Sequence, residues 1–480
     1  MRRSNCAGAM QYVPELTWIL FLRILDEREE VEAEQAEAVG ASYSPSLEAP
    51  FRWRDWAAPS GSKRMELQYA SLGAFFQFVN GELLPHLKNL RDQPGAGPRQ
   101  KVIGEIMAGV ERVRIDTERN FLDILDRVQQ IKDENIDPTH VFPLSQVYEG
   151  LLLKMGEKGN DGGQFFTPRE VIRVVVRTVD PKVGETVYDP GCGTGGFLVQ
   201  AFIHMKTRLG NEATADQVGA LRHTTFFGRE KENLIYPVAL ANMVLHGVDQ
   251  PNLWHGNTLT GNEIYGGLFQ DAPPLFDVVL SNPPFGGKEG PEAQTRFAYK
   301  TSATQILFLQ HVIDSLKPGG RCGIVLDEGV LFRTNESAFL QTKRKLLDEC
   351  NLWCIVSLPG GVFNAAGAGV KTNLLFFTKG SPTENIWYYD LSDIKVGKRT
   401  PFMLERFDEF FRLLPGREDS DRSWTVSRAD IEAKNYDLKA VNPNAKTDED
   451  TRTPIELLDI IEAKGKDVTQ ALNTLRALLV

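Results

Sequence analysis

The stretch Val187–Phe197, VYDPGCGTGGF, decides the fold class of this chain. A short β-prone run ends at Asp189, and an apolar helical pattern begins after glycines at Gly191, Gly193 and Gly196. Glycines between a strand and a helix let the backbone come within contact distance of a ligand at the carboxyl edge of a sheet. A carboxylate at position 189 then lies beside that ligand and favours a positively charged group, such as a sulfonium or an ammonium, over a pyrophosphate.

Short runs of β-branched or aromatic residues alternate with helical stretches over the following 200 or so residues, which is typical of an α/β domain with a mostly parallel sheet. The predicted strands are residues 185–189, 223–228, 276–281, 321–326, 352–358, 372–378 and 386–391.

The flanking regions have helical patterns. Apolar residues recur at spacings of three and four between residues 1 and 140, and Pro- and Gly-rich stretches at 40–62 and 91–100 predict loops there. From residue 418 the chain is charged and ends in an amphipathic helical pattern. We therefore predict an N-terminal helical domain at 1–140, an α/β domain at 141–417 and a C-terminal helical tail at 418–480.

Composition narrows the class of protein. The 54 basic and 64 acidic residues give a net charge of −10, which is unusual for a protein that holds DNA by itself. The five cysteines form no C-x-x-C pair and the histidines no ligand grouping, so we expect neither disulfides nor a metal site. The apolar segment Leu16–Leu25 is too short to span a membrane and contains Arg23, so we expect a cytoplasmic protein.

A second acidic residue, Glu230, follows the next predicted strand. The glycine string also matches a dinucleotide-binding pattern, but that pattern needs an acid about 20 residues on, and Glu230 lies roughly 40 residues beyond Asp189. An acid at the end of the second strand can accept hydrogen bonds from both hydroxyls of a ribose, whatever the rest of the cofactor is.

The strand at 276–281 runs into Asn282-Pro283-Pro284-Phe285, which it delivers to the same edge of the sheet. The Asn282 side-chain oxygen and the Pro283 carbonyl can both accept hydrogen bonds from one amino group. Since Pro283 and Pro284 have restricted φ and no N–H, we expect a stiff turn whose carbonyls stay free to face a substrate. When both N–H groups of an exocyclic adenine amine donate hydrogen bonds to these acceptors, the amine nitrogen becomes more nucleophilic. Phe285 offers a face on which the base can stack.

Two weaker motifs add candidate residues. Thr167 is a candidate N-cap with Glu170 three residues on, which predicts a capping box and a helix N-terminus able to bind a carboxylate. Asn257, in the segment HGNTL, could read an adenine edge, although an asparagine before a threonine is more often a turn residue.

Taken in order, these segments resemble the S-adenosylmethionine-dependent N6-adenine DNA methyltransferases, in particular the modification (M) subunits of type I restriction-modification systems. The matching segments are GGQFFTPRE (162–170), DPGCGTGGF (189–197), GRE (228–230), HGNTL (255–259), SNPPF (281–285), LKPGGRCGIVL (316–326) and KTNLLFF (371–377). LTWILFLRILDERE (16–29) and NYDLKAVNP (435–443) extend the resemblance over most of the chain. It implies a Rossmann-like methyltransferase domain between two helical regions.

The resemblance also implies roles for individual residues. The adenine that is flipped out of DNA would be held by Asn282, Pro283, Pro284 and Phe285. The residues implied to contact S-adenosylmethionine are Asp189, Gly191, Gly193, Thr194, Gly196 and Phe197 around its methionine part, Glu230 at the ribose, Phe166 and Thr167 near the carboxylate and amine, Asn257 at the adenine, and Asn282. Relatives commonly have aspartate at the position of Asn257.

The implied partners are DNA, a specificity (S) subunit that reads the target, a second M subunit in a complex of two M subunits with one S subunit, and a restriction (R) subunit in the full complex. Because the S subunit would read the sequence, the acidic balance of this chain need not oppose DNA binding. The C-terminal helix has no later chain to cover its apolar residues, so we expect it to dock on helices of the S subunit. These residues are Leu457, Ile461, Val468, Leu472, Leu475 and Leu479.

Three alternatives remain open at this point. A stand-alone amino-methyltransferase acting on DNA, RNA or a protein glutamine would use the same Asn-Pro-Pro-aromatic turn. A nicotinamide-dependent dehydrogenase would use the glycine string, although the missing acid and the unexplained turn disfavour it. A non-catalytic assembly protein could keep the fold, but Asp189, Glu230 and Asn282 are all present.

Overall fold

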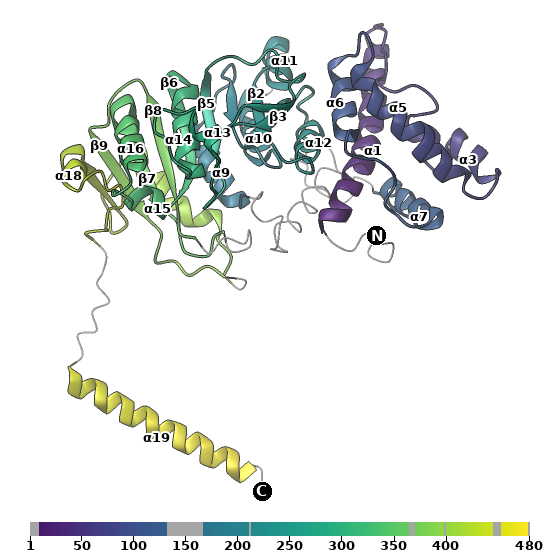
Figure 1. Cartoon of the computed structure of the whole chain (residues 1–480). Coiled ribbons are helices and arrows are strands. Elements are labelled where there is room, and N and C mark those ends of the chain that lie inside the picture. The colour runs from purple at the N-terminus through teal and green to yellow at the C-terminus, as the bar shows by residue number, and fades with distance from the viewer. Residues whose placement is uncertain are drawn as a thin grey trace. The chain divides into compact units, whose positions relative to one another are not determined.

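The structure is a computed structural model that describes residues 9–131, 167–210, 213–363, 370–397, 400–444 and 453–478 (Figure 1). The chain divides into two compact units, residues 1–441 and 442–480. In the described part of the chain, no helix combines the length and apolar character needed to cross a membrane.

The N-terminal region is helical, as the sequence predicts, and packs around tryptophans. Its helices are α1 (Ala9–Ala38), α2 (Trp53–Trp56), α3 (Ser62–Gln68), α4 (Ala74–Phe78), α5 (Leu84–Asn89), α6 (Pro98–Met107) and α7 (Glu118–Gln129), with a π-helical turn at Val79–Leu83 and a 3-10 turn at Leu90–Asp92. Trp18 stacks on Trp56 with ring centroids 6.5 Å apart. The loop predicted at 40–62 therefore needs a correction: it contains α2, whose Trp53 and Trp56 are fully buried.

One sheet of ten strands organises the α/β region. The strands are β1 (Val187–Asp189), β2 (Phe226–Glu230), β3 (Asn252–Asn257), β4 (Asn262–Tyr265), β5 (Phe276–Ser281), β6 (Leu316–Asp327), β7 (Cys350–Ser357), β8 (Thr372–Lys379), β9 (Asn385–Asp390) and β10 (Ser423–Ser427). Their order is β10-β9-β7-β8-β6-β5-β1-β2-β3-β4. The centre, from β6 to β3, is parallel, whereas β4, β8 and β10 pair antiparallel with their neighbours. All seven predicted strands are confirmed.

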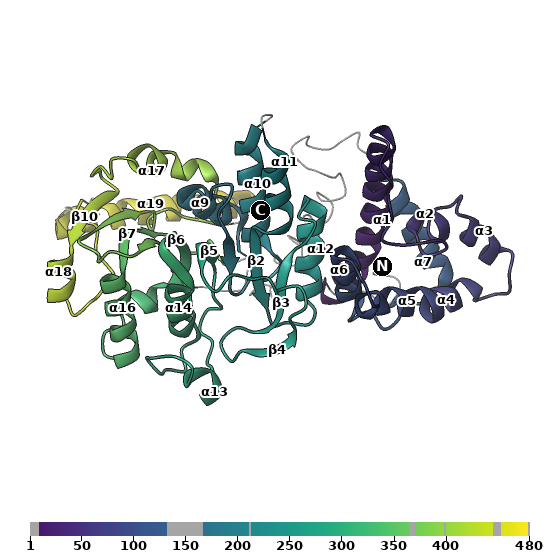
Figure 2. The same ribbon diagram turned by 90° about the horizontal axis from the view of Figure 1, so that it is seen from above.

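Helices cover both faces of the sheet, α9 and α10 on one side and α14 and α16 on the other (Figure 2). The helices of this region are α9 (Arg169–Val179), α10 (Gly196–Leu209), α11 (Ala215–His223), α12 (Tyr236–His246), α13 (Pro291–Gln294), α14 (Thr304–Ser315), α15 (Glu328–Phe332), α16 (Ser337–Glu349), α17 (Asp408–Leu413) and α18 (Arg428–Ala433), with a 3-10 turn at Leu404–Phe407. Alternating residues of a strand enter opposite cores: Val187 belongs to the first hydrophobic cluster and Tyr188 to the second.

The N-terminal helices share a hydrophobic core with the α/β region. Helix α12 packs against α1 and α6, and apolar residues of all three belong to one buried cluster. Arg28 of α1 also forms an ion pair with Asp249, just after α12. The two regions are therefore joined by packing as well as by the chain.

The parallel centre of the sheet brings the candidate site residues together. In β1, Asp189 pairs in register with Gly228 of β2, and Val187 pairs with Val278 of β5. Because these strands run in the same direction, the residues at their carboxyl ends meet at one edge. Asp189, Glu230 and Asn257 end β1, β2 and β3 there, and the turn that starts at Asn282 follows β5.

Two features lie near the predicted C-terminal boundary. Strand β10 comes after residue 417, yet it pairs with β9 and so belongs to the same sheet. The C-terminal helix α19 (Pro454–Leu478) belongs to the second unit. Of its predicted docking residues, Ile461, Val468, Leu472 and Leu475 are 67%, 58%, 49% and 57% exposed.

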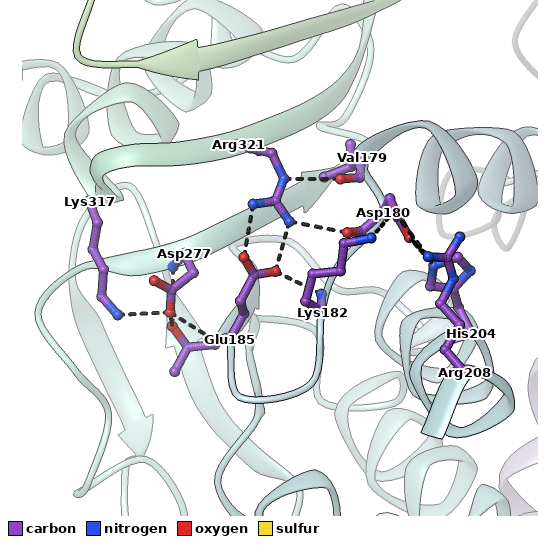
Figure 3. Close-up of polar contacts among 10 residues, drawn as sticks. Val179, Asp180, Lys182, Glu185, His204, Arg208, Asp277, Lys317 and Arg321 are labelled. Atoms are coloured by element: carbon purple, nitrogen blue, oxygen red, sulfur yellow. Dashed lines mark hydrogen bonds and ion pairs between the residues drawn. The ribbon is translucent and has the colours of Figure 1, made fainter. Parts of the chain in front are cut away.

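At the opposite edge of the sheet, Arg321 of β6 closes the end of α9 (Figure 3). Its Nη1 and Nη2 donate to the two Glu185 carboxylate oxygens at 2.8 and 2.7 Å. Its Nε also donates to the Val179 carbonyl at 3.0 Å, and Nη2 to the Asp180 carbonyl at 3.1 Å. One guanidinium thus satisfies carbonyls at the C-terminus of α9 and fixes the loop that leads into β1.

Replacing Arg321 with methionine should lower the free energy of unfolding by about 1–3 kcal/mol, because the Glu185 carboxylate and two helix-end carbonyls lose the hydrogen bonds of the guanidinium. Arg412→Met is the control, because the Arg412 side chain is 66% exposed and its ion pair with Glu409 measures 3.5 Å. The control should change stability by less than about 0.5 kcal/mol. Urea unfolding measures both values, and equal values would contradict this role of Arg321.

Candidate active site

A cavity of about 470 Å³ opens at the carboxyl edge of the parallel strands. The predicted site residues that line it are Thr167, Asp189, Gly191, Gly193, Thr194, Gly196, Phe197, Glu230, Asn257, Asn282, Pro284 and Phe285. Pro283 is buried and does not line the cavity, and Phe166 lies outside the described residues. The structure therefore brings the glycine loop and the Asn-Pro-Pro-Phe turn to one cavity.

The glycine loop turns sharply between β1 and α10. Gly193 and Gly195 adopt φ values of 53° and 80°, a left-handed conformation that residues with a Cβ adopt at a cost. The loop also lies directly on β2: a Cβ at Gly228 would come within 3.2 Å of the Cys192 Sγ and 2.7 Å of a Leu253 methyl carbon. Glycines in the loop and in β2 thus let the loop backbone lie close to the strand at the edge of the cavity.

Asp189 is 1% exposed, and its Oδ1 accepts a hydrogen bond from the Gly191 N–H at 3.1 Å. Burial, together with the nearby Glu230 charge, raises the pKa of Asp189 to about 8 against the opposing effect of the Gly191 bond. A positively charged ligand in the cavity would favour the ionised form of this carboxyl group.

Glu230 is 7% exposed and accepts three backbone hydrogen bonds. Its Oε2 accepts from the Gly193 N–H at 2.9 Å, and its Oε1 accepts from the Lys231 and Glu232 N–H groups at 2.8 Å each. Burial raises the pKa of Glu230 to about 7 although these bonds lower it. The bond to Gly193 couples the second acid directly to the glycine loop.

Asn282 presents an unusual side chain. Its Nδ2 donates to the Thr167 Oγ1 at 3.0 Å, whereas its Oδ1 is buried and has no hydrogen-bond partner among the described residues. A buried carbonyl oxygen without a partner is costly unless a ligand supplies the donor.

The prediction of a capping box at Thr167 is wrong: Pro168 is the N-cap residue of α9 and no side chain caps that helix.

The turn after Asn282 also has fewer unpaired carbonyl groups than the sequence predicts. The Pro283 carbonyl accepts a hydrogen bond from the Gln305 Nε2 at 3.3 Å, so it is not an unpaired acceptor, although a carbonyl oxygen has a second lone pair. The half-buried Phe285 makes an edge-to-face contact with Phe363, with ring centroids 5.3 Å apart.

Asn257 lines the cavity but also builds the local turn. Its Oδ1 accepts from the Leu259 N–H at 3.0 Å and the Thr260 N–H at 3.3 Å, which leaves its NH2 group for a ligand. The next residue, Thr258, donates to the Pro190 carbonyl at 2.6 Å. This bond ties the HGNTL segment to the glycine loop.

Sequence reasoning missed residues on α12 and α14 that complete the site. Asn242 of α12 donates from Nδ2 to the Thr194 carbonyl at 2.8 Å. On α14, Thr304 and Phe308 line the cavity, and Phe308 packs against Gly191. The signal available in the sequence was a polar residue inside an otherwise apolar helix, as at Asn242. The residues that the structure describes contain no group of three or more His, Cys, Asp or Glu side chains that could hold a metal ion.

Comparison with known proteins places the chain in a family. The sequence model for N-6 DNA Methylase matches residues 140–452. The methylase subunit of the type I restriction enzyme EcoEI from Escherichia coli is 33% identical over 98% of this chain and 94% of its own length.

Solved structures agree with this placement. A crystal structure of a modification subunit assigned to a type I restriction enzyme from Vibrio vulnificus has 31% identity and a TM-score of 0.77, covering 91% of this chain and 93% of that one. A chain from work on the assembly and conformational transition of a type I restriction-modification system has 38% identity and a TM-score of 0.76, covering 100% and 96%. The chain therefore belongs to the N-6 DNA methylase family, together with the methylase subunits of type I restriction enzymes.

Proposed function

We propose that this chain is the modification subunit of a type I restriction-modification complex and methylates the N6 amino group of adenine in DNA. The observation that carries the proposal is the Asn282 Oδ1, a buried acceptor without a partner among the described residues, on a side chain that lines the same cavity as Asp189 and Glu230. The family membership supports the same reaction.

The cavity residues fit S-adenosylmethionine. The glycine loop allows close approach, the buried Asp189 suits a neighbouring cation, and Glu230 can accept from ribose hydroxyls. The remaining residues proposed to hold the cofactor are Thr167, Gly191, Gly193, Thr194, Gly196, Phe197, Asn257 and Asn282, with Phe166 outside the described part. When bound, S-adenosylmethionine supplies a methyl group on a sulfonium.

The chain's own residues prepare the amine. The Asn282 Oδ1 accepts one N–H of the flipped adenine, and the second lone pair of the Pro283 carbonyl accepts the other. These two bonds draw the nitrogen lone pair out of conjugation with the ring, while Phe285 and Pro284 at the cavity wall hold the base. Holding the nitrogen in one position would lower the entropic part of the barrier to methyl transfer.

The proposed partners are DNA, an S subunit, a second M subunit and an R subunit. The exposed apolar residues of α19 support docking on the S subunit, because an amphipathic helix with uncovered apolar side chains fits a helical groove of a partner. The cysteines in the described residues are free and buried, which suits the reducing cytoplasm that we propose as its location.

Among the alternatives, a stand-alone amino-methyltransferase is less well supported, because relatives match the chain over nearly its whole length, N-terminal and C-terminal regions included. A nicotinamide-dependent dehydrogenase leaves the Asn282 acceptor unused. Titration of the purified chain with S-adenosylmethionine and with NAD separates these classes.

Binding of S-adenosylmethionine should strengthen as pH rises. With pKa values of about 8 and 7, Asp189 and Glu230 are largely neutral at pH 6.5 and ionised at pH 9. If only the form with ionised Asp189 binds the cation, the dissociation constant falls roughly 30-fold between these pH values. Calorimetry in buffers of different ionisation enthalpy should also detect proton release. Asp189→Asn should remove most of the pH dependence of the affinity. A pH-independent affinity of the wild type would contradict the prediction.

Asn282→Ala should lower the rate of methyl transfer to DNA by roughly 100-fold or more, because the amine loses an acceptor used in the transition state. The affinity for S-adenosylmethionine should change far less than the rate of methyl transfer, since Asp189 and Glu230 keep their contacts. The assay uses the chain co-expressed with its S subunit, tritiated cofactor and a target duplex. Methylation at the wild-type rate by this variant would refute the proposed function.

Truncation after Asp450 should leave cofactor affinity unchanged and abolish assembly with the S subunit, because it removes α19 but none of the cavity residues. Calorimetry and size-exclusion chromatography of the co-expressed chains measure the two properties. A truncated chain that still forms the complex would exclude α19 as the docking element.

A further inference from the structure

The middle of the Asn282-Pro283-Pro284-Phe285 turn has no backbone N–H groups that could fix its position. Pro283 and Pro284 have no N–H groups, so the middle of the turn can only accept hydrogen bonds. Its geometry then depends on donors from elsewhere in the fold. The proposed reaction needs that geometry to be accurate, because misplacement of a reacting group by about 1 Å can cost roughly 100-fold in rate.

Gln305, the second residue of α14, supplies such a donor. The side chain is 3% exposed, and its Nε2 donates to the Pro283 carbonyl at 3.3 Å. Its Oε1 accepts from the Asp327 N–H at 3.1 Å. Both ends of the amide are therefore used, and because Gln305 is buried the amide cannot exchange them for water without cost.

Asp327, which donates its N–H to the Gln305 Oε1, is itself held in place. Asp327 is the last residue of β6 and the N-cap of α15, where its Oδ1 accepts from the Val330 N–H at 3.1 Å. Strand β6 pairs in parallel with β5, the strand that leads into the turn. Gln305 thus bridges the end of β6 and the turn after β5, two segments that leave neighbouring strands at the same edge.

Thr167 holds the other side of the turn. Its Oγ1 accepts from the Asn282 Nδ2 at 3.0 Å, which assigns the nitrogen of that amide to Thr167 and leaves the oxygen for a ligand. Without this acceptor the amide could rotate and present N–H groups, which repel the N–H groups of an amine.

We propose that Gln305 and Thr167 are positioning residues that together set the two acceptors of the adenine amine, the Pro283 carbonyl and the Asn282 Oδ1. This inference rests on the proposed function. Gln305 orients the carbonyl by occupying one of its lone pairs, and Thr167 orients the amide by occupying its NH2 group.

Gln310, on the same helix, provides a matched control. It is 1% exposed, its Nε2 donates to the Tyr299 carbonyl at 2.9 Å, and its Oε1 accepts from the Tyr299 N–H at 3.0 Å. Gln310 therefore has similar burial to Gln305 and, like it, bonds to the backbone at both ends of its amide, but neither it nor Tyr299 lines the cavity. A purely structural role would give the two glutamines the same effect on activity.

The test compares Q305M and Q310M in the complex with the S subunit. Both variants should melt at a lower temperature than the wild type by similar amounts. Under single-turnover conditions with saturating cofactor, Q305M should be roughly 10- to 100-fold slower in methyl transfer, with its cofactor affinity within about twofold. Q310M should stay within about threefold of the wild-type rate.

Thr167 gives a second measurement that stands even if Q305M does not fold. T167V, which lacks the oxygen, should be slowed by the same range at saturating cofactor, whereas T167S keeps the acceptor and should stay within about threefold. Equal slowing of Q305M and Q310M, or wild-type rates for Q305M or T167V, would overturn the inference. A wild-type complex that transfers no methyl group would instead refute the proposed function.

Discussion

The parallel pairing of β1 with β2 on one side and β5 on the other is the constraint on which the site depends. It brings Asp189, Glu230 and Asn282 to one cavity although they are distant in sequence. All three present buried acceptor oxygens there, and burial of such groups is costly unless they are paired. Backbone N–H groups pair with the carboxylates in part, and we propose that a ligand with positive charge and N–H donors supplies the rest.

Hydrogen bonds to the glycine loop also explain why the loop and Glu230 act as one unit. The Gly193 N–H donates to Glu230, and Thr258 and Asn242 hold the loop carbonyls on either side of it. A change in any of these contacts moves the loop relative to the acid. The cavity wall is therefore set by contacts between four segments of the chain rather than by the loop sequence alone.

The sequence predicted the strands with buried apolar runs, since their pattern records burial directly, and it also located the turns that follow them. It did not predict β3, β4 and β10. Strand β3 is buried, but its residues Asn-Leu-Trp-His-Gly-Asn form no apolar run. Strand β4 is short and mostly exposed, with Glu263 and Ile264 facing solvent, so it lacks an alternating pattern. Strand β10 lies in a charged segment, and its pairing with β9 decides its conformation.

The bonding of individual site residues was harder to predict than their location. Thr167 looked like a helix cap, yet its hydroxyl contacts a residue 115 positions later. The Pro283 carbonyl looked free, but it accepts from a glutamine 22 positions later, on a different element. Periodicity reports burial and local turns report backbone conformation, so neither reports which side chains meet across the sheet edge.

We propose that the Asn282 turn receives an amine in the cavity bordered by the two buried carboxylates. A structure of the complex with a target duplex and a non-reactive cofactor analogue measures this directly. One adenine should lie outside the helix, with its N6 about 3 Å from both the Asn282 Oδ1 and the Pro283 carbonyl. An adenine bound with N6 away from these oxygens, or Asn282 separated from the base by other side chains, would contradict it.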